Sequence, residues 1–208
     1  FGPEEFWQLH ADLTRSESRQ PIRFEVTRYA DKAYRPTSDK QSAEHVERLK
    51  SGSFKVARRE DKPTRSRPSA PFITSTLQQA ASNRMGFSVK KTMMLAQRLY
   101  EAGFITYMRT DSTNLSQDAL ASCRDYVKKV FGDKFLPDQP RIYGSKEGAQ
   151  EAHEAIRPTD VNRRPTDIAG LEKDAEKLYE LIWRQFIACQ MADAEFLSTS
   201  ILVANGDY

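Results

Sequence analysis

A tyrosine and an arginine two residues apart are the side chains best suited to chemistry in this sequence. Tyr107 and Arg109 lie in the run G-F-I-T-Y-M-R-T-D-S-T-N-L-S from Gly103 to Ser116. Read as a strand, the run places both on one face together with Ile105. A phenol can attack a phosphodiester, and a guanidinium can stabilise the charge that develops on the phosphate. From this spacing alone, a half-buried structural tyrosine remains the favoured interpretation of Tyr107.

A second cluster of candidates follows in the run E-A-H-E-A-I-R-P that begins at Glu151. It superficially resembles the zinc motif H-E-x-x-H, but Arg157 stands where the second histidine is needed, which excludes a metalloprotease. His153 can donate a hydrogen bond to a phosphate oxygen, although a lone histidine near a proline-terminated helix is more often structural. Lys90 and Lys91 lie on the polar side of an expected helix and suit phosphate contact, or simply form its solvated face.

Composition narrows the class of protein. The 208 residues are 38% hydrophobic, enough for one large or two small cores, and 32 basic residues against 29 acidic ones leave a net charge of +3. Mean hydropathy is −0.69, which argues against a membrane protein. The pI near 8.8 permits a nucleic-acid partner without requiring one.

Neither cysteines nor carboxylates form a recognisable metal site. Cys123 and Cys189 are far apart, each at an apolar helical position, and are expected to be reduced core residues. No compact acidic set such as D-x-D-x-E is present to hold Mg²⁺, so we expect no metal site in this chain.

Hydrophobic patterning predicts an α+β chain with an interrupted sheet. The first part reads as a strand with Ile22, Phe24 and Val26 buried, a helix from Ser38 to Gly52, and a short strand at 54–57. The expected inward residues of that helix are Ala43, Val46 and Leu49. Residues 61–71 are rich in Pro, Arg, Ser and Lys and are expected to be an exposed linker with a domain boundary near residue 66.

The middle of the chain is predicted to be helical. One helix is expected to start with a capping box at Ser75 and to end at Gly86, and the next to run from Ser88 to Gly103. The apolar stripe expected on the latter consists of Val89, Met93, Ala96, Leu99 and Tyr100. Two short helices, a tight turn and a following strand describe a helix-turn-helix with a wing.

Two more helices and a final strand complete the pattern. Ser116 is an expected N-cap for a helix ending at Gly132, and the longest helix is expected over 171–189. A strand over 196–203 is expected to return to the sheet that begins at Ile22. The predicted domains are therefore 1–66 plus 194–208, rich in β-structure, and an inserted helical, winged-helix-like domain over 67–193.

Three runs closely resemble the bacterial topoisomerase I family of type IA DNA topoisomerases. They are L-Y-E-A-G-F-I-T-Y-M-R-T-D-S-T-N-L-S over 99–116, E-A-H-E-A-I-R-P-T over 151–159 and P-F-I-T-S-T-L-Q-Q-A-A over 71–81. The resemblance implies that Tyr107 is a nucleophile forming a 5′-phosphotyrosyl link to one DNA strand, without ATP, to relax negative supercoils. It implies a transition-state role for Arg109, DNA binding by His153, with Arg157, Lys90 and Lys91 as further candidates, and a helical domain inserted into a β-rich arch.

The resemblance also sets expectations for cofactors and partners. The family uses Mg²⁺, whose ligands are expected outside this chain, and none is expected to bind the chain itself. The expected partners are single-stranded DNA and the remaining domains of the same polypeptide, in a monomeric, cytoplasmic, nucleoid-associated protein without a membrane contact. Because the chain matches only the middle of the family's enzyme, we expect it to be an excised piece, unable by itself to cut or relax DNA.

Three other classes compete with this interpretation. A non-catalytic winged-helix DNA-binding module explains the helix pair without a nucleophile, and it would tolerate Tyr107→Phe. A tyrosine recombinase needs several arginines and histidines around the phosphate, and no such set precedes Tyr107. A structural scaffold is the remaining alternative.

Overall fold

The computed structural model describes residues 2, 4–15, 20–144, 153–168 and 170–208, which form two compact units. The first consists of Phe1–Thr64 and Phe196–Tyr208, and the second of Arg65–Glu195. The sequence prediction places the corresponding limits at 66 and 194. The chain contains both helices and strands, in keeping with the α+β class. Along the sequence, the second unit is inserted into the first.

Among the described residues, two antiparallel strand pairs and one helix open the first unit. β1 (His10–Leu13) pairs with β2 (Ile22–Glu25), with His10 opposite Glu25 and Leu13 opposite Ile22. β3 (Arg28–Tyr29) pairs with β4 (Lys32–Ala33), and α1 (Asp39–Ser51) follows. The strand near Ile22 is therefore found, but Ile22 itself is 59% exposed. Its predicted burial is wrong because β2 has a strand partner but no complete apolar layer over this residue.

The start of α1 follows the sequence prediction, whereas its buried face does so only at Leu49. The Ser38 hydroxyl accepts a hydrogen bond from the Gln41 N–H at 3.3 Å, as an N-cap should. Ser42, His45 and Leu49 are buried, and Ala43, predicted to face inward, is exposed. The face is set by the aromatic rings of Tyr29, Tyr34 and Tyr208, which pack around His45 at centroid distances of 4.7, 4.7 and 5.6 Å.

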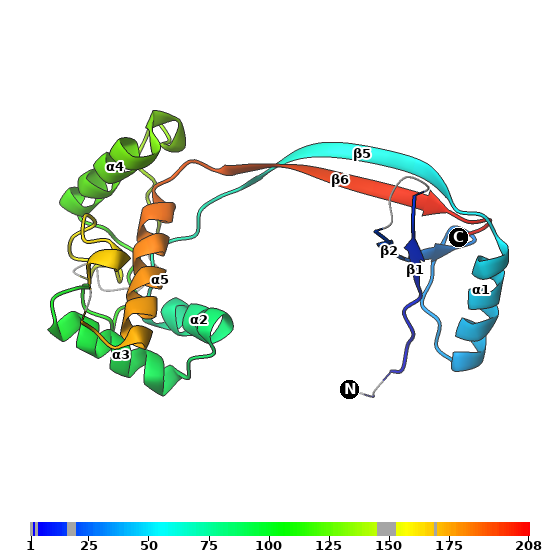
Figure 1. Cartoon of the computed structure of the whole chain (residues 1–208), viewed down its shortest axis with the longest axis horizontal. Helices are drawn as coiled ribbons and strands as arrows, with labels where there is room; N and C mark the ends of the chain where they lie inside the picture. The colour runs from blue at the N-terminus through cyan, green and yellow to red at the C-terminus, as the bar shows by residue number, and fades with distance from the viewer. Residues whose placement is uncertain (1, 3, 16–19, 145–152, 169) are drawn as a thin grey trace. The chain divides into compact units, whose positions relative to one another are not determined.

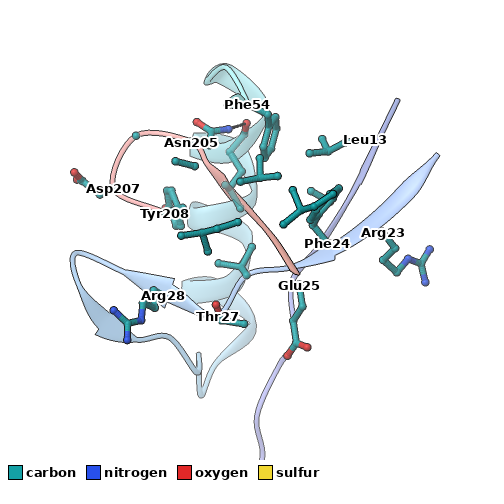
Figure 2. A pocket seen from close by; sticks show the side chains of 18 of the residues that line it. Leu13, Arg23, Phe24, Glu25, Thr27, Arg28, Phe54, Asn205, Asp207 and Tyr208 are labelled. Carbon is teal, nitrogen blue, oxygen red and sulfur yellow. Dashed lines mark hydrogen bonds between the residues drawn. The ribbon is translucent and has the colours of Figure 1, made fainter. Parts of the chain in front are cut away.

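A hollow of about 690 Å³ lies in the first unit (Figure 2). Residues of β2, the end of β6 and the following turn line it. The side chains of Leu13, Phe24 and Phe54 lie close together at one part of its wall (Figure 2). Asn205 lies at another, where its side-chain amide donates to the Leu49 carbonyl at 2.9 Å and so completes the end of α1.

The longest strands, β5 (Lys55–Ser66) and β6 (Ala194–Ala204), pair with each other (Figure 1). This corrects two expectations, since 61–66 is strand rather than linker, and β6 does not join the strand at Ile22. An ion pair between Arg65 and Glu195, 2.9 Å long, accompanies the pairing. Pro63 is tolerated because each strand of a two-stranded sheet has an unpaired edge.

In the described part of the second unit, four helices surround two apolar clusters. The helices are α2 (Thr74–Met85), α3 (Val89–Glu101), α4 (Gln117–Phe131) and α5 (Lys173–Cys189), with short 3₁₀ turns η1 (Asp133–Phe135) and η2 (Pro165–Asp167). One cluster is shared by α2, α3 and α5 and the other by α4 and α5. Figure 1 shows α2, α3 and α4 gathered around α5. Leu77, Leu95 and Ile182, from three of these helices, are fully buried in one cluster. As predicted, α5 is the longest helix in the described part of the chain.

The polar caps of these helices were largely readable from the sequence. The Ser88 and Ser116 hydroxyls accept from the N–H groups three residues later, at 3.2 and 3.3 Å. Gly86 ends α2 with φ of +68°, a left-handed conformation that favours glycine. The predicted start of α2 at Ser75 is wrong, because the helix begins at Thr74 and the Thr76 hydroxyl accepts from the Ile73 N–H at 3.0 Å.

The buried face of α3 agrees with the predicted stripe only in part. Thr92, Leu95, Ala96 and Leu99 are buried, whereas Val89 is 59% exposed. The prediction is confirmed at Ala96 and Leu99, and it missed Thr92 and Leu95 because the helix packs on α2 and α5 at once, which buries a wider face than one apolar stripe. Within the described residues, no helix combines the length and apolarity that a membrane crossing requires.

This corrected face gives a stability prediction. Leu95→Ala should lower the free energy of unfolding of the chain by about 2 to 5 kcal/mol, because it leaves a cavity in the core. Val89→Ala, the matched control on the same helix, should change it by less than about 0.5 kcal/mol because the side chain is exposed. Denaturant unfolding followed by circular dichroism measures both, and equal losses would contradict the observed face.

Candidate active site

The run that carries Tyr107 and Arg109 is held by other segments instead of forming a strand. In the described residues it contains one isolated bridge, between Ile105 and Pro158. Ile105 and Met108 are each 1% exposed, and Tyr107 is 46% exposed. The predicted alternation, with Ile105 on the face of Tyr107, is therefore wrong, and with it the strand expected as a wing.

One set of hydrogen bonds that fixes this run, called here the first fastening, comes from Thr74, the first residue of α2. The Thr74 N–H donates to the Thr110 carbonyl at 2.9 Å, and the Thr74 hydroxyl lies 2.8 Å from the Met108 carbonyl. These contacts bind the chain on both sides of Arg109. The resemblance included this part of the sequence, but spacing alone gave no sign that Thr74 would reach the tyrosine segment.

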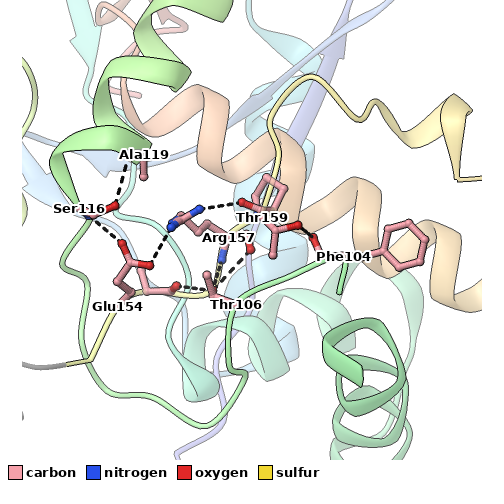
Figure 3. Close-up of polar contacts among 9 residues, drawn as sticks. Phe104, Thr106, Ser116, Ala119, Glu154, Arg157 and Thr159 are labelled. Atoms are coloured by element: carbon pink, nitrogen blue, oxygen red, sulfur yellow. Dashed lines mark hydrogen bonds and ion pairs between the residues drawn. The ribbon is translucent and has the colours of Figure 1, made fainter. Parts of the chain in front are cut away.

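A second fastening comes from the chain just after His153 (Figure 3). The Thr106 N–H donates to the Arg157 carbonyl at 2.9 Å, and the Arg157 N–H donates back to the Thr106 hydroxyl at 3.0 Å. The Thr159 N–H donates to the Phe104 carbonyl at 3.0 Å. Thr106, the residue before Tyr107, is thus fixed by its backbone and by its side chain.

An ion pair supports this second fastening (Figure 3). Arg157 donates from Nη2 to Glu154 Oε2 at 2.7 Å and from Nη1 to the Pro158 carbonyl at 3.0 Å. Glu154 Oε1 accepts from the Ser116 N–H at 2.8 Å, at the start of α4. The Arg157 side chain is only 15% exposed. Its guanidinium therefore binds the protein itself, and the predicted helix before Pro158 is absent over the described residues 153–158.

The charge of Glu154 is stabilised by these partners. Burial by itself would raise the pKa of its carboxyl, but the hydrogen bonds from Ser116 and Arg157 outweigh burial and hold the pKa below its ordinary value. Glu151 and Ala152, which precede His153 in the recognised motif, lie outside the described residues.

Tyr107 presents its ring at the surface. The ring meets that of Tyr100, on α3, edge to face at 5.2 Å between centroids and 66° between planes. With Thr106 bonded on one side and Met108 buried on the other, the backbone has little freedom while the phenol stays accessible. A nucleophile needs this combination of fixed backbone and accessible oxygen.

Arg109 and His153 line one open hollow of about 550 Å³. The other lining residues come from the start of α2 and from the residues after Arg109; they are Ile73, Thr74, Ser75, Gln78, Thr110 and Asp111. Arg109 and His153 are exposed, and Arg109 forms no ion pair with any described residue. Two predicted site residues more than forty positions apart are thus brought together, and the Arg109 guanidinium, the His153 imidazole and the hydroxyl of exposed Ser75 share a surface suited to phosphate.

The two lysines lie elsewhere on the second unit. Lys91 Nζ is 2.5 Å from Asp174 Oδ2 and 4.4 Å from the centroid of the Phe87 ring. The hydrogen bond from Lys91 lowers the pKa of the Asp174 carboxyl. Lys90 is exposed. Neither lysine lines the hollow that contains Arg109 and His153.

Comparison with known proteins agrees with this arrangement. A family model described as DNA topoisomerase matches residues 1–208. Over all 208 residues the chain is 62% identical to DNA topoisomerase 1 of Pseudomonas aeruginosa and 57% identical to that of Escherichia coli, covering 24% of each. The chain belongs to the bacterial DNA topoisomerase I family. It also matches the solved full-length topoisomerase I of Thermotoga maritima, with a TM-score of 0.70 and 35% identity, over 88% of this chain and 29% of that one.

The family resemblance raises the question of Mg²⁺, and the described residues of this chain do not fit a site for it. Among them, no group of three or more His, Cys, Asp or Glu side chains is placed to hold a metal ion. Cys123 and Cys189 are buried and unbridged, as predicted. Cys189 is fully buried, and this burial raises the pKa of its thiol to about 12, which disfavours the thiolate that metal binding or nucleophilic attack needs.

The pKa of Glu154 gives a pH-dependent prediction. Glu154→Gln should lower the free energy of unfolding by about 1 to 2 kcal/mol at pH 7, because it removes the charge-assisted bond to Arg157. A carboxyl with a depressed pKa stabilises the fold above its unfolded pKa, near 4.3, and this stabilisation is lost as the pH falls through the folded pKa. The difference between variant and wild type should therefore shrink as the pH falls below about 4.

Unfolding titrations of this chain at several pH values provide the measurement. Asp125→Asn, at an exposed position of α4, is the control and should change stability little at any pH. A difference for Glu154→Gln that stays constant down to pH 3 would contradict the role of its charge.

Proposed function

We propose that this chain carries the nucleophile of a bacterial type IA topoisomerase. The Tyr107 oxygen attacks a phosphodiester of single-stranded DNA, a bond from that oxygen to phosphorus forms, and the bond from phosphorus to the 3′ oxygen breaks. The phenol loses its proton and the 3′ oxygen gains one. The 5′-phosphotyrosyl link replaces one phosphoester bond with another, so resealing of the strand needs no ATP. Passage of DNA through the break before resealing relaxes negative supercoils.

The observation that carries this proposal is an exposed phenol on a segment fixed from both sides. Tyr107 is 46% exposed, whereas Met108 is 1% exposed and Thr106 is bonded to Arg157. A fixed backbone holds the attacking oxygen near one geometry and so lowers the entropic part of the barrier.

Arg109 and His153 contact the phosphate of the DNA strand in this proposal. The Arg109 guanidinium lies in the shared hollow, where it can stabilise the charge that grows on the non-bridging oxygens. His153 helps to bind or position the strand there. Lys90 remains a candidate DNA contact. Lys91 contributes less to DNA binding because its charge is paired with Asp174, and Arg157 supports the site indirectly because its charge is paired with Glu154.

The rest of the proposal concerns the whole protein, of which this chain spans about a quarter of the length of its relatives. The first unit belongs to a β-rich arch, and α2 and α3, connected through Gly86, serve as a helix-turn-helix of the inserted helical domain. Mg²⁺ is held by residues other than those described here, and no step above passes through it. The protein acts as a monomer in the bacterial cytoplasm, at the nucleoid.

Trapping of the covalent intermediate tests the proposal. The full-length protein is mixed with a single-stranded oligonucleotide, stopped with denaturant and digested for mass spectrometry. A nucleotide-bearing peptide should contain Tyr107 and should vanish in Tyr107→Phe. Tyr100→Phe is the matched control, because its ring lies 5.2 Å from that of Tyr107, and it should leave the adduct intact.

The same experiment separates the main alternative. The exposed Lys90 on a helix pair also suits a winged-helix module that only binds DNA. Such a module would form no adduct in the wild-type protein and would bind DNA equally well with Tyr107→Phe. That result would replace the proposed function.

A separate prediction concerns the chain by itself. The 208 residues should neither cleave single-stranded DNA nor relax a supercoiled plasmid, because Tyr107 and Arg109 act together with parts of the polypeptide outside the chain. Binding to single-stranded DNA should be weak and should fall steeply as salt increases. Gel assays of cleavage and fluorescence anisotropy at several salt concentrations measure both. Strong cleavage by the chain, or tight binding whose affinity does not change with salt concentration, would contradict this prediction.

A further inference from the structure

We propose that Thr74 is a positioning residue that fixes Arg109 for the cleavage step. This inference rests on the proposed function, since it concerns the geometry of the same site. It begins from the run P-F-I-T-S-T-L-Q-Q-A-A over 71–81, to which neither the composition nor the proposed chemistry assigns a role.

The contacts of Thr74 enclose Arg109 from both directions along the chain. The Thr74 hydroxyl lies 2.8 Å from the Met108 carbonyl and 3.0 Å from the Thr110 carbonyl, and it accepts from the Thr110 N–H at 2.9 Å. The Thr74 N–H donates to the Thr110 carbonyl at 2.9 Å. The side chain and backbone of Thr74 thus bond to the carbonyl of the residue before Arg109 and to the N–H and carbonyl of the residue after it.

The place of Thr74 in its helix makes these contacts possible. Thr74 is the first residue of α2, and the first N–H groups of a helix have no partner within it. Its N–H is therefore free to bond to Thr110 without weakening the helix. Thr110 is only 7% exposed, so water has little access to replace a lost bond to its N–H.

The same short stretch also holds the segment of His153. The Phe72 carbonyl accepts from the Ile156 N–H at 2.8 Å, and the two residues form an antiparallel bridge. Phe72 is 5% exposed and Ile156 is fully buried. Residues 72–74 therefore join the Arg109 segment and the His153 segment to the start of α2, which explains why Arg109 and His153 line one hollow.

Loss of the Thr74 hydroxyl should loosen the chain at Arg109 without removing any group that contacts DNA in the proposed reaction. Displacements of about 1 Å at a reacting centre reduce rates by on the order of 100-fold. The affected quantity is the rate of cleavage, because the guanidinium must meet charge that develops only in the transition state.

The test uses the full-length protein and single-turnover cleavage of a single-stranded oligonucleotide. Thr74→Val, which keeps the shape but removes the hydroxyl, should slow adduct formation by about 10- to 100-fold, with DNA affinity changed by less than about 2-fold. Thr74→Ser, the matched control, keeps the hydroxyl and should stay within about 3-fold of the wild type. If the valine variant does not fold, Thr74→Ala removes the same hydroxyl and carries the same expectation.

A double-mutant cycle distinguishes positioning from general stabilisation. In an Arg109→Ala background, Thr74→Val should slow cleavage by less than about 2-fold further, because the group it positions is already absent. If the rate reduction of the double variant equals the product of the two single reductions, Thr74 acts independently of Arg109, and the inference is overturned. Cleavage by Thr74→Val at the wild-type rate would also overturn it.

The outcomes for the inference and for the proposed function remain distinct. A wild-type protein that forms the Tyr107 adduct, together with an unaffected Thr74→Val variant, would overturn the role of Thr74 alone. A wild-type protein that forms no adduct would overturn the proposed function, and the role of Thr74 with it.

Discussion

The structure of the second unit depends on how the backbone around Tyr107 satisfies its hydrogen bonds. Buried N–H and C=O groups need partners, and this run does not obtain them from a neighbouring strand of a sheet. Thr74 supplies partners on one side, at Met108 and Thr110, and residues 155–159 supply them on the other. The tyrosine therefore lies on an irregular segment whose position is set by two distant parts of the chain.

This arrangement explains how exposure and order occur together at Tyr107. Regular structure would have placed a row of side chains on each face, with the phenol half covered by its neighbours. Here Ile105 and Met108 both turn into the core and leave the phenol exposed between them. The Glu154–Arg157 pair connects the segment after His153, which bonds to Thr106, to the start of α4.

Local features were predictable because their physical cause lies within a few residues. The caps at Ser38, Ser88 and Ser116 and the left-handed Gly86 follow from hydrogen bonds or backbone preferences of adjacent residues. Buried faces were less predictable. The inward side of α1 is polar His45 rather than Ala43 because three tyrosines from other segments enclose it. The partner of β6 could not be chosen from the sequence, since several strands with similar patterns compete for it.

The sequence by itself determined which residues can do the chemistry and to which family the chain belongs. Three recognisable runs sufficed for the family, and a phenol and a guanidinium in one of them with an imidazole in another sufficed for the chemistry, because side-chain chemistry is a property of the residue type. Only the tertiary structure decided which of the candidates meet. It placed Arg109 with His153, turned Arg157 toward Glu154, and bound Thr74 to both sides of Arg109. Such contacts join residues tens of positions apart, and no local pattern encodes them.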